Sequence, residues 1–91
     1  MRIVWDDDKN QKLILERGIS FEEAASSILN NKIIDIVKNP SQPGQFFFVL
    51  VLNEYTHIVP FSLGPNEEVI LKTIYPSRKY QKKYGGNKNE D

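Results

Sequence analysis

The segment Gly18-Ile-Ser-Phe-Glu-Glu-Ala-Ala-Ser-Ser-Ile-Leu29 carries the most regular pattern in this chain of 91 residues. Ser20 and Glu23 have the spacing of a capping box, in which the serine caps a helix and the glutamate reaches back to the serine's amide. Apolar side chains follow at helical spacing, namely Phe21, Ala24, Ala25, Ile28 and Leu29. This spacing predicts a helix that places one stripe of its surface on a hydrophobic core.

The residues before this helix predict a short strand and a first helix. Arg2 to Trp5 is an apolar run of strand type, and we expect Trp5 to lie in the core. Three aspartates follow at positions 6–8, where their negative charge suits the positive end of a helix over Lys9–Arg17. Helix capping explains them better than a magnesium site, because three consecutive residues rarely point one way. Gly18 is suited to end this helix in the left-handed conformation.

The residues after the capped helix predict four strands, over residues 32–37, 46–52, 55–61 and from Val69 onward. Residues 39–44 contain two prolines and a glycine, which indicates a surface loop. The run Phe46–Leu52 is apolar without alternation, so we expect its strand to be covered on both faces at the centre of the sheet. Asn53-Glu54 makes a tight turn into the next strand, where Pro60 indicates an edge or a bulge.

This order of elements predicts an α+β fold. We expect a mostly antiparallel sheet of about five strands, with two N-terminal helices on one face and a short C-terminal helix. The apolar fraction of 40% is enough for one core, and the length leaves no room for a second domain. We therefore expect a single domain over residues 1–84 and a flexible tail over residues 85–91.

The composition excludes several classes of chemistry. The absence of cysteine rules out disulfides, thiolate metal sites and cysteine nucleophiles. No glycine-rich phosphate loop, nucleophile elbow or zinc spacing is present, and we expect neither a metal nor a cofactor. The start of the chain lacks the apolar region of a signal peptide. The longest apolar run, Phe46–Leu52, is too short to cross a bilayer, so we expect a cytoplasmic protein without a membrane partner.

The charges are segregated although the chain is neutral overall. Residues 1–68 carry ten acids against six bases, whereas residues 72–88 carry six cations and no acid. A helix over Ser77–Tyr84 would align three pairs one turn apart: Arg78 with Lys82, Lys79 with Lys83, and Tyr80 with Tyr84. Basic side chains interleaved with aromatic ones suit phosphate and base-stacking contacts. The alternative interpretation is a solvated helix whose lysines confer solubility and whose tyrosines pack on the sheet.

Three residues outside this helix are further candidates. Lys72 and Tyr75 lie on the preceding strand and point to opposite faces, so at most one of them joins the basic patch. His57 is the single histidine, which excludes any site that needs two. It alternates with apolar and aromatic neighbours along its strand, and a partly buried structural imidazole is favoured over a catalytic one.

Two blocks of the sequence resemble the BrnT-type toxins. Trp5-Asp6-x-x-Lys9, followed by Arg17-Gly18-Ile19-Ser20-Phe21-Glu22-Glu23-Ala24, is similar to the family's N-terminal signature. The segment Ile74-Tyr-Pro-Ser-Arg78-Lys79 is similar to its strand, Ser/Ala-Arg element and basic helix. The resemblance implies a RelE-like fold and a metal-independent ribonuclease toxin of a type II toxin–antitoxin system. It also implies a small antitoxin partner of the DNA-binding, ribbon-helix-helix type, and homo-oligomers of the toxin formed through the toxin–antitoxin complex.

The chain departs from the family pattern at two places. Glu16-Arg17 stands where the family has Lys-His, so any role of that histidine is lost or passes to Arg17. Pro76-Ser77-Arg78 stands where the family has Ser-Ala-Arg, which keeps the arginine and changes its approach. These differences mark a divergent member.

The preferred hypothesis is RNA cleavage with the substrate's own 2′-OH as nucleophile. Arg78 is the expected phosphate clamp, and the expected base is a lysine activated by cationic neighbours, such as Lys79. Tyr75 or Tyr80 would stack a base or donate a proton, and His57 is a fallback acid or base. The expected substrate-binding residues are Lys72, Tyr80, Lys82, Lys83 and Tyr84.

Two other hypotheses are an RNA- or protein-binding module without turnover and a purely structural interaction domain. The phenylalanine-rich strand also leads us to expect self-association of the isolated protein if a sheet edge lies open.

Overall fold

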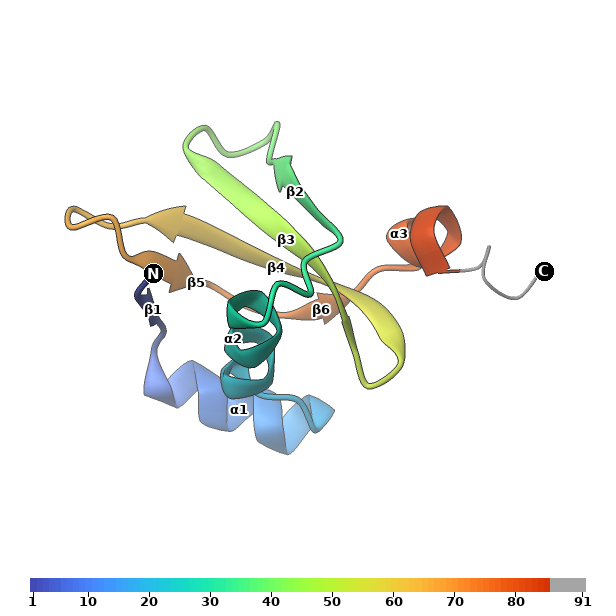
Figure 1. Cartoon of the computed structure of the whole chain (residues 1–91). Coiled ribbons are helices and arrows are strands. Elements are labelled where there is room, and N and C mark those ends of the chain that lie inside the picture. Colours follow the sequence, from blue (N-terminus) through green and yellow to red (C-terminus); the bar gives the residue numbers. More distant parts are fainter. Residues whose placement is uncertain (86–91) are drawn as a thin grey trace.

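The computed structural model describes residues 1–85 and has an α+β fold (Figure 1). Its helices are α1 (Asp7–Arg17), α2 (Phe21–Leu29), α3 (Arg78–Tyr80) and the π-helical turn η1 (Gln81–Gly85). Its strands are β1 (Ile3–Val4), β2 (Asp35–Lys38), β3 (Gln45–Leu52), β4 (Tyr55–Leu63), β5 (Val69–Leu71) and β6 (Tyr75–Pro76). Of the tail predicted over residues 85–91, residues 86–91 lie outside the described residues. None of the described helices is long and apolar enough to span a membrane.

The strands form one sheet in the order β1-β5-β4-β3-β2, and β6 pairs with β4 beyond the end of β5. Strands β2 to β5 form the predicted antiparallel meander, while β1 runs parallel to β5. The long strands β3 and β4 cross the middle of the molecule (Figure 1). The mostly antiparallel sheet is thus confirmed. It has six strands because the strand predicted from Val69 is divided in two.

This division explains Pro60. β4 pairs Phe61 with Leu71 and Ile58 with Tyr75. Residues 72–74 therefore lie opposite only residues 59–60 of β4, which leaves one extra residue between β5 and β6. The Lys72 N–H donates to the Pro60 carbonyl at 2.8 Å, which means that the ring nitrogen of Pro60 also faces this segment. A proline costs no ladder bond beside such a bulge. The predicted edge position is wrong, because β4 is central, and the alternative of a bulge is found on the neighbouring strand.

The first helix starts and stops near the predicted residues. α1 begins at Asp7, two residues earlier than expected, with Asp7 and Asp8 in its first turn. Asp6 is the N-cap, but its side chain makes no capping hydrogen bond. The acids therefore act through their charge at the helix start. Gly18 ends the helix at φ 65°, and its N–H donates to the Ile14 carbonyl at 3.0 Å, as predicted.

The capping box at α2 is confirmed in its main bond. The Glu23 N–H donates to Ser20 Oγ at 3.2 Å. The Ser20 hydroxyl in turn contacts the Glu23 carboxylate at 3.2 Å, where a bond from the carboxylate to the serine amide was predicted. Four of the five predicted core residues are buried, and only Leu29 is exposed, by 59%. The apolar stripe thus ends one residue early, at Ile28.

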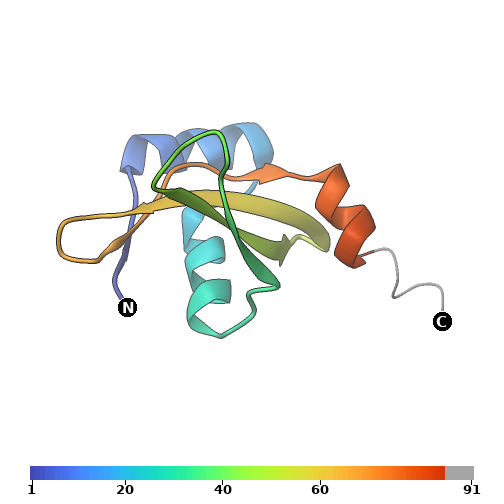
Figure 2. The same cartoon turned by 90° about the horizontal axis from the view of Figure 1, so that it is seen from above.

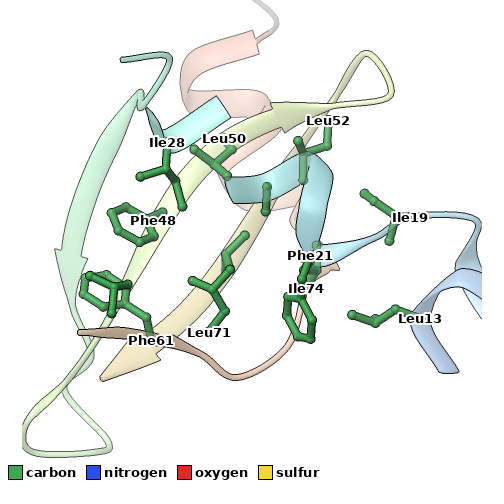
Figure 3. Packing of buried hydrophobic residues seen from close by; sticks show 13 residues of the cluster. Leu13, Ile19, Phe21, Ile28, Phe48, Leu50, Leu52, Phe61, Leu71 and Ile74 are labelled. Carbon is green, nitrogen blue, oxygen red and sulfur yellow. The ribbon is translucent and has the colours of Figure 1, made fainter. Parts of the chain in front are cut away.

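The core lies between the two N-terminal helices and one face of the sheet (Figure 3). The helices contribute Leu13, Phe21, Ala24 and Ile28, and the central strands contribute Phe48, Leu50, Leu52, Val59 and Phe61. The rings of Phe48 and Phe61 stack with centroids 4.1 Å apart. Trp5 is half-buried and stacks on Phe21 at 5.9 Å. Both early helices therefore cover the same face, as expected.

The two hairpin strands also match their predicted positions, while β2 is shifted. Asn53 and Glu54 both have positive φ, 53° and 64°, which gives a two-residue turn whose twist suits the flanking strands. β2 covers Asp35–Lys38, whereas residues 32–37 were predicted. β2 starts later because the chain first makes a turn after α2, in which Asn31 adopts φ 59°.

Candidate nucleic-acid interface

The predicted C-terminal helix exists and is built of two unlike turns. Ser77 caps α3, since its Oγ accepts the Tyr80 N–H at 3.2 Å. The chain then widens into the π-helical turn η1, which the sequence pattern did not indicate. Figure 2 shows this helix at the end of the molecule away from the N-terminus. The helical segment thus covers Arg78–Gly85, close to the predicted range.

A glutamine side chain helps to hold this segment on the sheet. Gln81 Oε1 accepts both the N–H of Thr56 at 2.9 Å and its hydroxyl at 2.6 Å. Thr56 is fully buried, so its N–H and its hydroxyl both depend on this contact. Sequence reasoning missed Gln81, because a polar residue between lysines carries no signal of an inward contact.

The segment lies on the face of the sheet opposite to α1 and α2. The Tyr80 ring meets the Phe47 ring edge-on, with centroids 6.1 Å apart. Phe47 precedes the core residue Phe48, and successive side chains of a strand point to opposite faces. The helices of this chain therefore occupy both faces of the sheet, and the C-terminal one covers the side that the N-terminal pair leaves open.

The tyrosines of the segment pack toward the sheet. Tyr80 and Tyr84 are half-buried and stack nearly parallel, at 6.0 Å between centroids and 5° between planes. The Tyr84 hydroxyl donates to Asp35 Oδ2 at 2.7 Å. These contacts agree with the interpretation in which the tyrosines dock the helix.

The contact between Tyr84 and Asp35 shifts the pKa of both groups. The hydrogen bond from Tyr84, and next the backbone N–H of Ile36, lower the pKa of Asp35 from its ordinary value. The same bond raises the pKa of Tyr84, because losing the proton would break it beside a carboxylate. The pair therefore holds Asp35 ionised and Tyr84 neutral around neutral pH.

The cations of the segment face solvent. Arg78, Lys79, Lys82 and Lys83 are all exposed. The ammonium groups of Lys79 and Lys83 lie 5.4 and 5.2 Å from the centroids of the Tyr80 and Tyr84 rings. The helix is thus divided lengthwise, with aromatic groups on the sheet and positive charge outside. Such an outer surface suits contact with phosphates.

His57 lies on β4 beside the short strand that leads to this helix. It is half-buried, and its register partner is Pro76 on β6. Its Nδ1 lies 2.9 Å from the carbonyl oxygen of Tyr55. Because a carbonyl can only accept, Nδ1 carries the proton in this contact, so in the neutral imidazole Nε2 is the hydrogen-bond acceptor. A neutral imidazole held in this tautomer can take a proton at Nε2.

Strand β6 places the backbone of Tyr75 beside β4, which carries His57, and leads on to Arg78. Tyr75 pairs with Ile58 and is 38% exposed, and Arg78 follows Pro76 by two residues. His57 shares its sheet face with its partner Pro76, whereas Tyr75 shares the face of Ile58, so the side chains of His57 and Tyr75 point to opposite faces of the sheet. These positions depend on the β4–β6 pairing, which periodicity did not predict.

Lys72 lies elsewhere. It lines a pocket of about 230 Å³ between α1 and the bulge after β5, together with Lys9, Lys12, Leu13, Glu16, Arg17 and Thr73. None of the four described cations of the C-terminal helix lines this pocket. The predicted basic patch is thus split between two places.

Arg17, at the position of the family's histidine, has a structural contact. Its Nη1 donates to the Ile74 carbonyl at 2.6 Å, and Lys9 Nζ donates to the Lys72 carbonyl at 3.3 Å. β1 ends before it can pair with these residues, so the two cations cap carbonyls at a sheet edge that α1 covers. No group of three or more histidine, aspartate or glutamate side chains that could hold a metal occurs in the described part of the chain.

The fold described above is similar to that of a solved ribonuclease toxin. The crystal structure of the Brucella abortus ribonuclease toxin BrnT at 1.1 Å resolution matches with a TM-score of 0.62. The match covers 85% of this chain and 96% of that chain, at 18% sequence identity. The resemblance to BrnT-type toxins is thus confirmed for the fold, and the low identity agrees with a divergent sequence. No family model matches the chain, and no curated protein does.

Proposed function

We propose that this protein is the toxin of a type II toxin–antitoxin pair and cleaves RNA without a metal, using the substrate's 2′-OH. The observation that carries the proposal is the position of His57 and Arg78 relative to β6, in a chain that has the fold of a ribonuclease toxin. His57 pairs with Pro76, and Arg78 follows Pro76 by two residues. The exposed lysines of the C-terminal helix add a surface for the flanking RNA backbone.

The first step removes the proton of the 2′-OH as its oxygen attacks the adjacent phosphorus. His57 Nε2 is the proposed base, because the contact of Nδ1 with Tyr55 leaves Nε2 free to accept a proton. The O2′–P bond forms, and a phosphorane with additional negative charge develops. Arg78 is placed to stabilise this charge, since its guanidinium can donate to two phosphate oxygens at once.

The second step breaks the P–O5′ bond and protonates the leaving oxygen. Lys79 is the proposed donor of this proton, because it is exposed and follows Arg78 directly in α3, whereas Tyr75 points to the sheet face opposite His57. The products are a 2′,3′-cyclic phosphate and a free 5′-hydroxyl. Lys82 and Lys83 hold neighbouring phosphates, whereas Tyr80 and Tyr84 keep the helix on the sheet.

The test is cleavage of a mixed RNA by purified protein in the presence of EDTA. We expect fragments that end in a 2′,3′-cyclic phosphate, and no cleavage at a site whose nucleotide carries a 2′-deoxy sugar. Arg78→Ala should lower the rate by about 100-fold or more, as for other lost charge-stabilising donors. Lys32→Ala, which removes an exposed lysine elsewhere, is the matched control. Cleavage of the 2′-deoxy substrate would contradict the mechanism.

The second candidate is a binding module of the same fold. The structural contact of Arg17 with the Ile74 carbonyl favours this candidate. Arg17 replaces the family's histidine and is engaged with a backbone carbonyl, so it brings no base to the site. This candidate predicts RNA binding with a steep salt dependence and no cleavage under any of these conditions. Purified protein therefore separates the two candidates.

The proposed partner is a small antitoxin encoded beside this chain. Its binding segment should carry acidic side chains, because the outer surface of the C-terminal helix is cationic. Co-purification with a ribbon-helix-helix protein from the same operon, and loss of toxicity on its co-expression, are the expected results.

A further inference from the structure

We propose that the pocket between α1 and residues 72–73 is a second anion site, which takes a phosphate group of the RNA strand at some distance from Arg78. The identification of RNA as the source of that phosphate rests on the function proposed above. The existence of the anion site does not, because it follows from the pocket itself.

The pocket is built by one face of α1. Lys9, Lys12, Leu13 and Glu16 recur at intervals of three and four residues, so the helix turns all of them toward the bulge after β5. Arg17 and Lys72 add two further cations from either side. The pocket is thus lined by four cationic side chains and by one carboxylate, that of Glu16. Clefts lined by one sign of charge concentrate ions of the opposite sign.

Two of these cations are already held in position. Lys9 donates to the Lys72 carbonyl and Arg17 to the Ile74 carbonyl, at 3.3 and 2.6 Å. An ammonium has three donor hydrogens and a guanidinium has five, so both retain donors for an anion. Side chains that are ordered before binding lose less entropy when the anion arrives. Leu13, which is buried, forms an apolar floor beneath them.

The size and lining of the pocket fit a phosphate group. Its volume of about 230 Å³ lies below the range typical of pockets for drug-sized ligands. Thr73 adds a hydroxyl, which is a common donor to phosphate oxygens. Lys12 and Lys72 make none of the described side-chain hydrogen bonds, so both of their ammonium groups can contact an anion.

The chain itself links this pocket to the candidate catalytic region. Residues 72–78 run from the bulge through β6 to Arg78. Even fully extended, six residue steps span at most about 20 Å. An RNA strand of several nucleotides can bridge that distance, so one strand can contact both places.

The test is an NMR titration of the full chain, in a buffer without phosphate, with two probes: inorganic phosphate and an oligonucleotide made only of deoxynucleotides. We expect phosphate to shift the amide signals of Leu13 and Thr73. Lys12→Gln should weaken binding of the oligonucleotide several-fold and reduce the salt slope by about 0.7. Lys32→Gln, an exposed lysine after α2, should change neither quantity.

The outcomes separate the two proposals. Phosphate shifts at Leu13 and Thr73 without RNA cleavage would retain the anion site and reject the nuclease. Cleavage of RNA with no phosphate shifts at these residues, or with equal effects of Lys12→Gln and Lys32→Gln, would overturn the anion site alone. Lys12→Glu reverses the charge at this solvent-exposed position and should weaken oligonucleotide binding more than Lys12→Gln does. Equal affinities of these two variants would also contradict the anion site.

Discussion

Asp35 joins two parts of the molecule through one carboxylate. Its Oδ1 accepts the N–H of Ile36 at 2.8 Å, and its Oδ2 accepts the hydroxyl of Tyr84 at 2.7 Å. The first bond occupies a backbone donor of the outer strand β2, and the second holds the C-terminal helix. A residue that appeared to be an ordinary polar position in an isoleucine-rich strand thus fastens the candidate interface.

The pH dependence of this contact can be worked out from both partners. Folding lowers the pKa of Asp35, so the stability that its ionised carboxylate contributes is present above its pKa in the unfolded chain, about 3.9. This stability is lost as the pH falls through the lower pKa of the folded chain. Folding raises the pKa of Tyr84, so the stability that its protonated hydroxyl contributes is present below its pKa in the unfolded chain, about 10. This stability is lost as the pH rises through the higher pKa of the folded chain.

We therefore expect the C-terminal helix to loosen at both extremes of pH, as measured by amide exchange protection of residues 78–84. Tyr84→Phe should remove the contribution of this contact to both transitions, whereas Tyr55→Phe, the control, should leave them in place. Equal pH profiles for the wild type and Tyr84→Phe would reject the role of the hydrogen bond.

Gly18 provides a test of a backbone requirement. Its φ of 65° lies in the left-handed region, and a Cβ at this position would meet no atom within 4 Å. Gly18→Ala should therefore cost about 1–2 kcal/mol of the free energy of unfolding through backbone strain alone. Gly18→Asn should cost less, because asparagine tolerates this region. Urea denaturation measures both, and an alanine variant as stable as the wild type would contradict the expectation.

At the scale of elements, buried polar side chains join helices to their neighbours. Asn10, buried on α1, accepts the N–H of Phe21 at 2.7 Å and donates to the Glu22 side chain at 2.7 Å, which ties α1 to α2. Gln81 does the same between η1 and β4 through Thr56. These contacts determine how the elements sit on the sheet, and neither of them follows the apolar pattern.

Gln81→Ala should destabilise the fold by about 1–3 kcal/mol, because the buried N–H and hydroxyl of Thr56 lose their shared acceptor. We expect a lower urea midpoint together with faster amide exchange in residues 78–84. Gln11→Ala, on the exposed side of α1, is the control and should change the free energy of unfolding by less than about 0.5 kcal/mol. Similar losses in the two variants would argue against the docking role.

At the scale of the whole molecule, the sheet has an open side at β2. Among the described residues, β2 pairs only with β3. Apolar side chains are exposed around it, with Leu29 at 59%, Ile34 at 38% and Ile36 at 52%. The phenylalanine-rich strand β3 is paired on both sides, so the exposed edge that could pair with another molecule is that of β2.

The isolated protein should therefore self-associate at high concentration through this edge, and Ile36→Lys should suppress the association in light scattering. Leu15→Lys removes an equally apolar and more exposed residue on α1, and serves as the control. A wild-type protein that stays monomeric at millimolar concentration would contradict the prediction, as would equal suppression by both variants.

Much of the architecture could be predicted because it depends on neighbours in the chain. The Ser20 cap, the left-handed Gly18, the turn at Asn53-Glu54 and the unbroken apolar run of β3 are all consequences of local geometry or periodicity. The candidate site was less predictable. Arg78 was identified from its charge and family likeness, but the approach of His57 to β6 needs a strand pair that is only two residues long.

By itself, the sequence determined the order and type of the main elements, the face that α2 turns to the core, and the cationic character of the C-terminal helix. Only the tertiary structure decided where that charge is presented. It separates Lys72 from Arg78 by a bulge opposite Pro60 and turns Tyr80 and Tyr84 onto the sheet. It also joins Asp35 to Tyr84 across 49 positions of the chain. The physical reason is that periodicity reports which residues are buried, whereas the partner of a polar group depends on how distant segments meet.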